Sequence, residues 1–153
     1  MTRPQPTIKQ ALKDSLQIGG RYLLAVSGGV DSMVMLHATS ALSRELEFHI
    51  EVAHLDHGLR ESSKEDAEFV RDTCLKLKVP FHSKRVSLDS LSQNIEAWGR
   101  RERYGYFKEI MSENSLDWTL TAHTANDVAE TLLMRLVSNK ELNSISKIDS
   151  KRK

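Results

Sequence analysis

The sequence contains very little cysteine. Among its 153 residues Cys74 is the single cysteine, so neither a disulfide framework nor a Cys-x-x-Cys metal or redox site can form within one chain. Cys74 falls on the apolar side of an expected helix. We therefore interpret it as a small core residue.

Long apolar runs are also absent. No stretch of the sequence is long enough to span a membrane, and Met1 to Lys13 lacks the apolar segment of a signal peptide. We therefore expect a cytoplasmic protein that has no membrane partner.

The charges nearly cancel. A net charge of +1 at pH 7 gives the chain no overall basic field, so charge alone does not indicate a nucleic-acid partner. RNA binding would need a local patch, such as the basic cluster at 151–153, although a solvated terminus explains that cluster more simply. With 39% hydrophobic residues, a chain of this length can build one core and one domain.

The chain is organised around Arg21 to Leu42. Tyr22 to Val26 is a short apolar run typical of a buried strand, and Ser27, Gly28 and Gly29 interrupt it. The apolar residues that follow have the spacing of one helix face. This stretch therefore predicts a strand, a tight glycine loop and a helix.

A loop of this kind can bind an anion. Adjacent glycines allow successive amide N–H groups to turn inward, and the helix points the positive end of its dipole at the same place. Ser27 and Ser32 add hydroxyl donors. Asp31 indicates magnesium with a nucleotide, because a carboxylate beside phosphates is unfavourable unless a cation offsets its charge. The alternative is a simple turn in which Asp31 or Ser32 caps the helix.

Strand-like and helix-like segments alternate along the chain. This alternation predicts an α/β fold with a doubly wound, mostly parallel sheet and helices on both faces. We expect a nucleotide-binding domain over 1–137 and a disordered tail over 138–153, where the apolar pattern fails. The expected strands are 22–26, 48–53 near a sheet edge, one starting at 79–82, and 118–122; the expected helices are 7–16, one starting at 62, 94–113 and 126–137.

Four polar clusters fall at the carboxyl ends of the expected strands or at nearby helix starts: SGGVDS, HLDHGLR, NIEAWGRRERY and TAHTANDVAET. Ligands bind at this end of open α/β sheets, so the clusters predict one shared cleft. Taken singly, each cluster has a simpler interpretation. Arg100, Arg101 and Arg103 could form a solvated helix face, and His123 could be a capping or core histidine.

The loop SGGVDS fits neither G-x-x-x-x-G-K-[ST] nor G-x-G-x-x-G. It resembles the SGGxDS loop of the PP-loop ATP pyrophosphatases, and the four clusters together resemble the N-terminal domain of the tRNA(Ile)-lysidine synthetases from about Gly20 to Leu136. The resemblance implies a Rossmann-like PP-loop ATPase fold that uses ATP and Mg²⁺. It also implies a reaction in which ATP adenylates the first anticodon cytidine of an isoleucine tRNA with a CAU anticodon, and free lysine displaces AMP to form lysidine.

The same resemblance assigns roles to individual residues. Asp31, His123 and Asp127 are expected to be catalytic, with Asp31 also binding magnesium. His54 and His57 flank Asp56 like metal ligands, but the family uses this segment as a wall of the nucleotide site, so we do not expect zinc. Whether two copies form a homodimer stays open. The residues expected to bind the nucleotide are Ser27, Gly28, Gly29, Val30, Asp31, Ser32, Ala53, His54, Arg60 and Arg100.

The sequence departs from the family pattern in two places. Thr124, Asn126 and Val128 replace residues of the family cluster TAHHxDDQxET, and the glycine-rich segment expected after Leu136 is missing. The chain is therefore either an ATP-dependent tRNA-modifying ligase or a truncated, non-catalytic or partner-dependent ATP-binding module. Among other PP-loop enzymes, thiolases typically rely on paired cysteines, which a single cysteine argues against. Amidating members need a glutaminase partner, which the sequence does not exclude.

Overall fold

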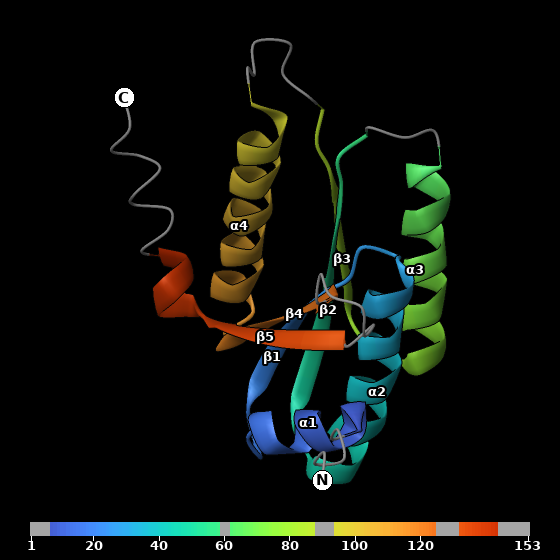
Figure 1. Ribbon diagram of the computed structural model, residues 1–153, viewed down its shortest axis with the longest axis vertical. Coiled ribbons are helices and arrows are strands. Elements are labelled where there is room, and N and C mark those ends of the chain that lie inside the picture. Colours follow the sequence, from blue (N-terminus) through green and yellow to red (C-terminus); the bar gives the residue numbers. More distant parts are fainter. Residues whose placement is uncertain (1–6, 59–61, 88–93, 125–131, 144–153) are drawn as a thin grey trace, which may run out of the picture.

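The computed structural model describes residues 7–58, 62–87, 94–124 and 132–143, and Figure 1 shows how the elements are arranged. No helix within these ranges is both long and apolar enough to cross a membrane. In chain order the elements are α1 (Ile8–Ser15), β1 (Arg21–Ala25), α2 (Val30–Leu46), β2 (His49–Asp56), α3 (Ser63–Leu77), β3 (Phe81–Arg85), α4 (Ile95–Glu113), β4 (Trp118–Thr124) and β5 (Leu132–Ser138).

The strands form a single sheet in the order β3-β2-β1-β4-β5. All neighbouring pairs are parallel except β4 and β5, which confirms the expected mostly parallel α/β sheet. The expectation that the second strand lies near an edge was wrong, because β2 lies between β1 and β3. Its residues Ile50 to His54 are all buried, as both faces of an internal parallel strand are covered.

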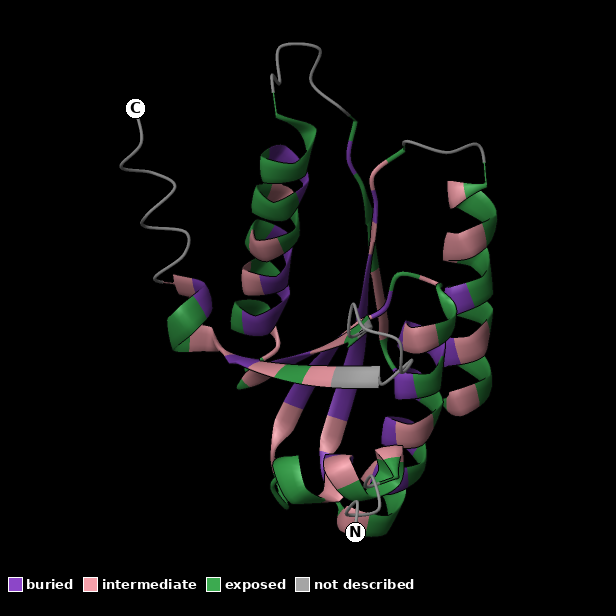
Figure 2. Cartoon of the chain, viewed as in Figure 1, coloured by how far each residue is buried: buried purple, intermediate pink, exposed green. Residues whose placement is uncertain are grey.

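Helices cover both faces of the sheet, as expected for a doubly wound fold (Figure 1). Successive residues of β1 point to opposite faces, so Leu24 packs with the α1, α2 and α3 side and Leu23 packs with the α4 side. Both residues are fully buried. Figure 2 shows the same division, with buried residues along the strands and on the side of α4 that faces the sheet.

The segment expected to be a helix over 126–137 is a strand where the structure describes it. Leu132–Ser138 forms β5, which runs antiparallel to β4 with Trp118 opposite Ser138 and Thr124 opposite Leu132. Residues 125–131 lie outside the described residues. A short apolar run fits a buried helix or a strand equally well by periodicity, and here the strand satisfies the backbone groups on the free edge of β4.

The segment expected to be a disordered tail begins inside the folded region. Residues 139–143 are helical, and Leu142 is 1% exposed because it packs with Leu23 and Val137 on the α4 side of the sheet. Leu142, one of the isolated apolar residues of this segment, therefore contributes to the core. Residues 144–153 lie outside the described residues.

A carboxylate is buried beneath the α4 face of the sheet. Glu51 of β2 is 6% exposed, and its oxygens lie 2.8 Å from His49 Nε2 and 2.6 Å from His82 Nε2. Burial raises the pKa of Glu51, but the hydrogen bonds from His49 and His82 outweigh burial and hold this pKa below its ordinary value. Folding therefore gains stability from the Glu51 carboxylate above the ordinary pKa and loses it as the pH falls.

We expect Glu51→Gln to reduce the sensitivity of the fold to acid. The free energy of unfolding of the parent should fall steeply as the pH drops below the ordinary value of 4.5, and that of the variant should fall less. At pH 7 the variant should be less stable by about 1 to 2 kcal/mol, because charged hydrogen bonds are lost. Denaturant unfolding between pH 7 and about pH 3 measures both effects. The control is Glu109→Gln, which removes an exposed carboxylate. If the free energy of unfolding falls equally at acid pH in the parent and in Glu51→Gln, the prediction is wrong.

Candidate functional site

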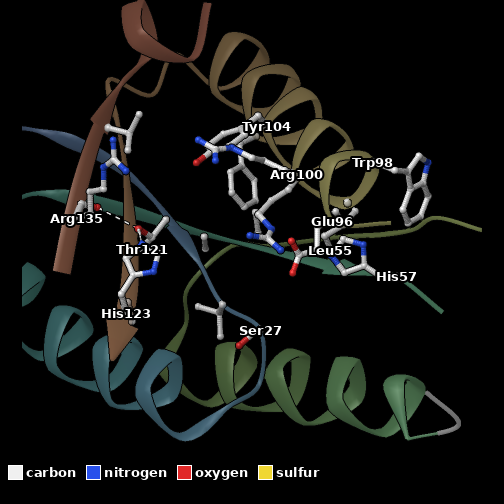
Figure 3. A pocket seen from close by; sticks show the side chains of 18 of the residues that line it. Ser27, Leu55, His57, Glu96, Trp98, Arg100, Tyr104, Thr121, His123 and Arg135 are labelled. Carbon is white, nitrogen blue, oxygen red and sulfur yellow. Dashed lines mark hydrogen bonds between the residues drawn. The ribbon is translucent and has the colours of Figure 1, made fainter. Parts of the chain in front are cut away.

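A cavity of about 720 Å³ opens at the carboxyl ends of β1, β2 and β4, under the first turns of α4 and beside β5. Figure 3 shows side chains from all of these elements pointing toward it. Each of the four polar clusters contributes residues. The described residues that line the cavity are Ala25, Val26, Ser27, Ala53, Leu55, His57, Ile95, Glu96, Trp98, Gly99, Arg100, Arg103, Tyr104, Phe107, Thr121, Ala122, His123, Arg135 and Val137.

The loop SGGVDS joins β1 to α2 as the sequence indicates. Gly28 has a φ of 93°, in the left-handed region that favours glycine, and Gly29 is the N-cap of α2. No side chain caps this end of the helix by a hydrogen bond. The amides of the first turn and the helix dipole therefore point out of the end of α2 beside the cavity, which is a site suited to phosphate.

The loop's hydroxyl groups are engaged within the loop itself. Ser32 is buried and donates a hydrogen bond to the Gly29 carbonyl at 2.9 Å, and its Oγ lies 3.2 Å from Ser27 Oγ. Ser27 also accepts a bond from the Gly29 amide at 3.3 Å. Ser27 lines the cavity, whereas the rest of the loop, Gly28, Gly29, Val30, Asp31 and Ser32, is not among the residues that line it. Asp31 is half-buried in the first turn of α2.

His54 does not lie in the cavity, contrary to the expectation that it binds the nucleotide. The strand β2 continues to Asp56, so Ala53, Leu55 and His57 share the cavity face and His54 points to the opposite face. His54 is 3% exposed, and its Nδ1 lies 2.8 Å from the Val26 carbonyl oxygen. The Val26 amide bonds the Ala53 carbonyl at 3.0 Å. Both bonds fix the residue that precedes the glycine loop.

The contact between His54 and Val26 leads to a prediction. We expect His54→Ala to destabilise the fold by about 2 to 3 kcal/mol and to weaken nucleotide binding, since it leaves the Val26 carbonyl without its donor and opens a small cavity. His54→Asn should recover much of the loss, because the asparagine amide can donate from the position of Nδ1. Chemical denaturation of the two variants measures the difference. Equal stability of both would show that the bond to Val26 does not matter.

The second buried acid of β2 holds the turn after the strand. Asp56 Oδ1 accepts a hydrogen bond from the Gly58 amide at 2.7 Å, and Arg85 Nε lies 3.5 Å from Oδ2. Burial raises the pKa of Asp56, but the hydrogen bond from the Gly58 amide and the charge of Arg85 act against burial, and the pKa lies below its ordinary value. Within the described ranges, no group of three His, Cys, Asp or Glu residues could hold a metal ion.

The helix α4 begins at the expected place and forms one wall of the cavity. Asn94 caps it by accepting a hydrogen bond from the Ala97 amide at 3.0 Å. Arg100 and Arg103 line the cavity, and the Arg100 guanidinium lies 5.4 Å from the centre of the Tyr104 ring. Arg100 and Arg103 therefore form part of the cavity wall, whereas Arg101 is exposed and does not line the cavity.

The remaining charged groups come from β4, β5 and the start of α4. His123 of β4 lines the cavity, with its Nε2 2.9 Å from Thr121 Oγ1. Arg135 also lines the cavity, and its carbonyl lies 3.5 Å from Thr121 Oγ1. Sequence reasoning missed Arg135 because its strand was expected to be a helix. Glu96 is the one carboxylate among the lining residues, so three arginines give the described lining a positive charge.

Two expected site residues, Arg60 and Asp127, lie outside the described residues, as do Asn126 and Val128. The described arrangement can bind an anionic ligand, since guanidinium groups and a helix N-terminus face one cavity. Ala53 and Arg100 line the cavity, and their contact with a nucleotide stays a prediction.

Curated proteins similar to this chain include tRNA(Ile)-lysidine synthases from several organisms. The tRNA(Ile)-lysidine synthase of Petrotoga mobilis is 43% identical over 121 residues, which cover 76% of this chain and 39% of that protein. The tRNA(Ile)-lysidine synthase of Coxiella burnetii is 37% identical over 140 residues, covering 91% of this chain and 31% of that protein. The chain thus spans less than half the length of these curated relatives.

Among solved structures, the U34-tRNA thiolase NcsA from Methanococcus maripaludis, with its 4Fe-4S cluster, is similar in fold. The TM-score is 0.63 at 14% sequence identity, covering 73% of this chain and 41% of that chain. The family profile described as PP-loop domain matches residues 2–153. With the glycine loop at the start of α2 and the cavity beside it, this match shows that the chain belongs to the PP-loop domain family.

Proposed function

We propose that this chain provides the ATP-dependent part of a tRNA-modifying ligase of the lysidine type. The observation that carries the proposal is the uncapped N-terminus of α2 behind Gly28, next to a cavity with three arginines. The curated relatives supply the substrate class, since they are named tRNA(Ile)-lysidine synthases. The proposed substrates are ATP, free lysine and an isoleucine tRNA with a CAU anticodon.

The proposed reaction has two steps. The C2 oxygen of the anticodon cytidine attacks the α-phosphorus of ATP, and pyrophosphate leaves. The amine of lysine then attacks C2 of the adenylated cytidine, AMP leaves with the C2 oxygen, and the lysine nitrogen loses a proton. The amides at the start of α2 would hold the leaving pyrophosphate, and Arg100 and Arg103 would bind phosphate oxygens.

His123 and Asp127 complete the proposed catalytic set. His123 lies on the cavity wall with Nε2 against Thr121 Oγ1, so Thr121 fixes the ring and Nδ1 can hold a proton near the reacting groups. Asp127, four residues further along the chain, is proposed to act on the α-phosphate of ATP.

The residues present fit a magnesium ion that is held by one carboxylate together with the phosphates of a nucleotide. The described ranges hold no cluster of three potential ligands, but Mg²⁺ with a nucleotide is usually held by one or two carboxylates and the phosphates. Asp31, half-buried at the start of α2, would be that carboxylate. The ion would neutralise charge on the phosphates.

A second candidate is an ATP-binding module that has no turnover of its own or acts only with a partner. Thr124, Asn126 and Val128 remove an imidazole and an acid from the expected catalytic cluster. These substitutions should weaken chemistry more than nucleotide binding.

Release of AMP from ATP labelled at the α-phosphate separates the two candidates. The purified chain is incubated with labelled ATP, with and without lysine and the CAU-anticodon isoleucine tRNA. AMP release that requires both the tRNA and lysine supports the ligase. A folded chain that binds Mg·ATP but releases no AMP supports the binding module, and a chain that binds no ATP contradicts both.

A further inference from the structure

His57 lines the cavity, and the roles assigned above give its side chain no specific contact with a ligand. It follows Asp56, the last residue of β2, and its ring lies edge-on to Trp98 of α4, with 6.0 Å between ring centres and 62° between planes. Figure 3 shows the two rings next to each other at one end of the cavity. A Cβ added to Gly99 would lie 3.5 Å from His57 Cε1, so the ring packs directly on the helix backbone.

One nitrogen of this ring is buried. His57 Nδ1 has almost no accessible surface and no hydrogen-bond partner among the residues that the structure describes. A neutral imidazole carries a proton on one nitrogen and a lone pair on the other. A buried N–H without an acceptor costs more than a buried lone pair without a donor, so the proton belongs on Nε2.

The ring is also held neutral by its surroundings. Burial lowers the pKa of His57, and the charge of Arg103 lowers it further, while Asp56 and Glu102 act in the opposite direction with smaller effects. The corner of the cavity around the ring includes Trp98, and the apolar Leu55 and Ile95 and the charged Glu96 and Arg103 line the same cavity. A neutral N–H donor suits an uncharged acceptor better than a phosphate, which a guanidinium group binds more strongly.

From this geometry we infer that His57 is a specificity-determining residue, whose Nε2–H donates a hydrogen bond to a ring nitrogen or carbonyl of a heterocyclic base. This inference rests on the proposed function, because it assigns the base of a nucleotide to one end of the same cavity. The base is either the adenine of ATP or a base of the RNA substrate. Both present sp² acceptors of this kind.

The protonation state can be tested on the parent chain without any ligand. Long-range proton–nitrogen correlation spectra of the protein labelled in its histidine rings distinguish the two neutral tautomers from the charged ring. The His57 signals are identified by their loss in His57→Gln. We expect the Nε2–H tautomer at pH 7, and a Nδ1–H tautomer or a charged ring would overturn the inference.

Two variants test the donor itself, since a glutamine amide reaches the position of Nε2 and an asparagine amide reaches only that of Nδ1. Calorimetry measures the binding of Mg·ATP, magnesium tripolyphosphate and the trinucleotide CAU, with thermal unfolding as the check of folding. For the ligand whose base occupies the corner, His57→Gln should bind within about threefold of the parent and His57→Asn about tenfold more weakly. Tripolyphosphate, which has no base, should bind equally to all three proteins.

The outcomes are distinguishable. A selective loss for Mg·ATP assigns the corner to adenine, and a selective loss for CAU assigns it to an RNA base. Equal affinities of both variants for both ligands would overturn the inference. If the parent binds neither Mg·ATP nor tripolyphosphate, the proposed function fails, while the ring spectra and the CAU series still decide the role of His57.

Discussion

Replacing Asp31 with asparagine is expected to lower the rate of AMP formation by about 10² to 10³. Asp31 is half-buried in the first turn of α2, directly after the glycine loop. Asparagine keeps the shape of the side chain but removes the charge that would hold magnesium on the nucleotide phosphates. The fold should be unaffected, so the loss would come from the site alone.

The readout independent of turnover is the magnesium dependence of ATP affinity. In the parent, magnesium should tighten ATP binding, and in Asp31→Asn this effect should be much smaller. The matched control is Asp72→Asn, which removes an exposed carboxylate on α3 paired with Arg71. Should Asp31→Asn keep both the rate and the magnesium effect, the assignment of Asp31 would be wrong.

Gly28→Ala is expected to have the second largest effect, reducing ATP affinity by about 10²-fold and stability by about 2 kcal/mol. Gly28 has a φ of 93°, which alanine adopts only with strain. An added Cβ would also lie 3.3 Å from the Cβ of Asp66, so the loop or α3 must shift. Either shift would turn the loop amides away from the phosphates.

The control for Gly28→Ala is Gly105→Ala, because a Cβ at Gly105 would meet nothing within 4 Å. Gly105 lies inside α4, where alanine is favoured over glycine, so this variant should gain about 0.5 to 1 kcal/mol. Calorimetric titration with Mg·ATP and denaturant unfolding measure both variants. A Gly28→Ala protein that binds ATP like the parent would show that the left-handed backbone is not required.

The glycine loop and the start of α4 could be predicted because their signals are local. The apolar run before Ser27, the glycine pair and the helix spacing that follows lie within one short stretch of sequence. Asn94 caps α4 through its own side chain and the amide of Ala97, three residues away. Local signals of this kind do not depend on the rest of the fold.

The face of β2 that each histidine occupies could not be predicted in the same way. The sequence indicated that the strand ends at Ala53, whereas it continues to Asp56 because β3 pairs with it as far as Arg85. Two additional residues of strand separate His54 from His57. His54 therefore supports Val26 on one side of the sheet and His57 lines the cavity on the other.

The sequence by itself determined the order of strands and helices as far as β4, the glycine loop before α2, and the family to which the chain belongs. Only the tertiary structure decided that Leu132–Ser138 is a strand, that Leu142 is part of the core, and that Arg135 lines the cavity. Whether a short apolar run forms a strand depends on the strand that it pairs with, here β4, and the run itself does not indicate that partner.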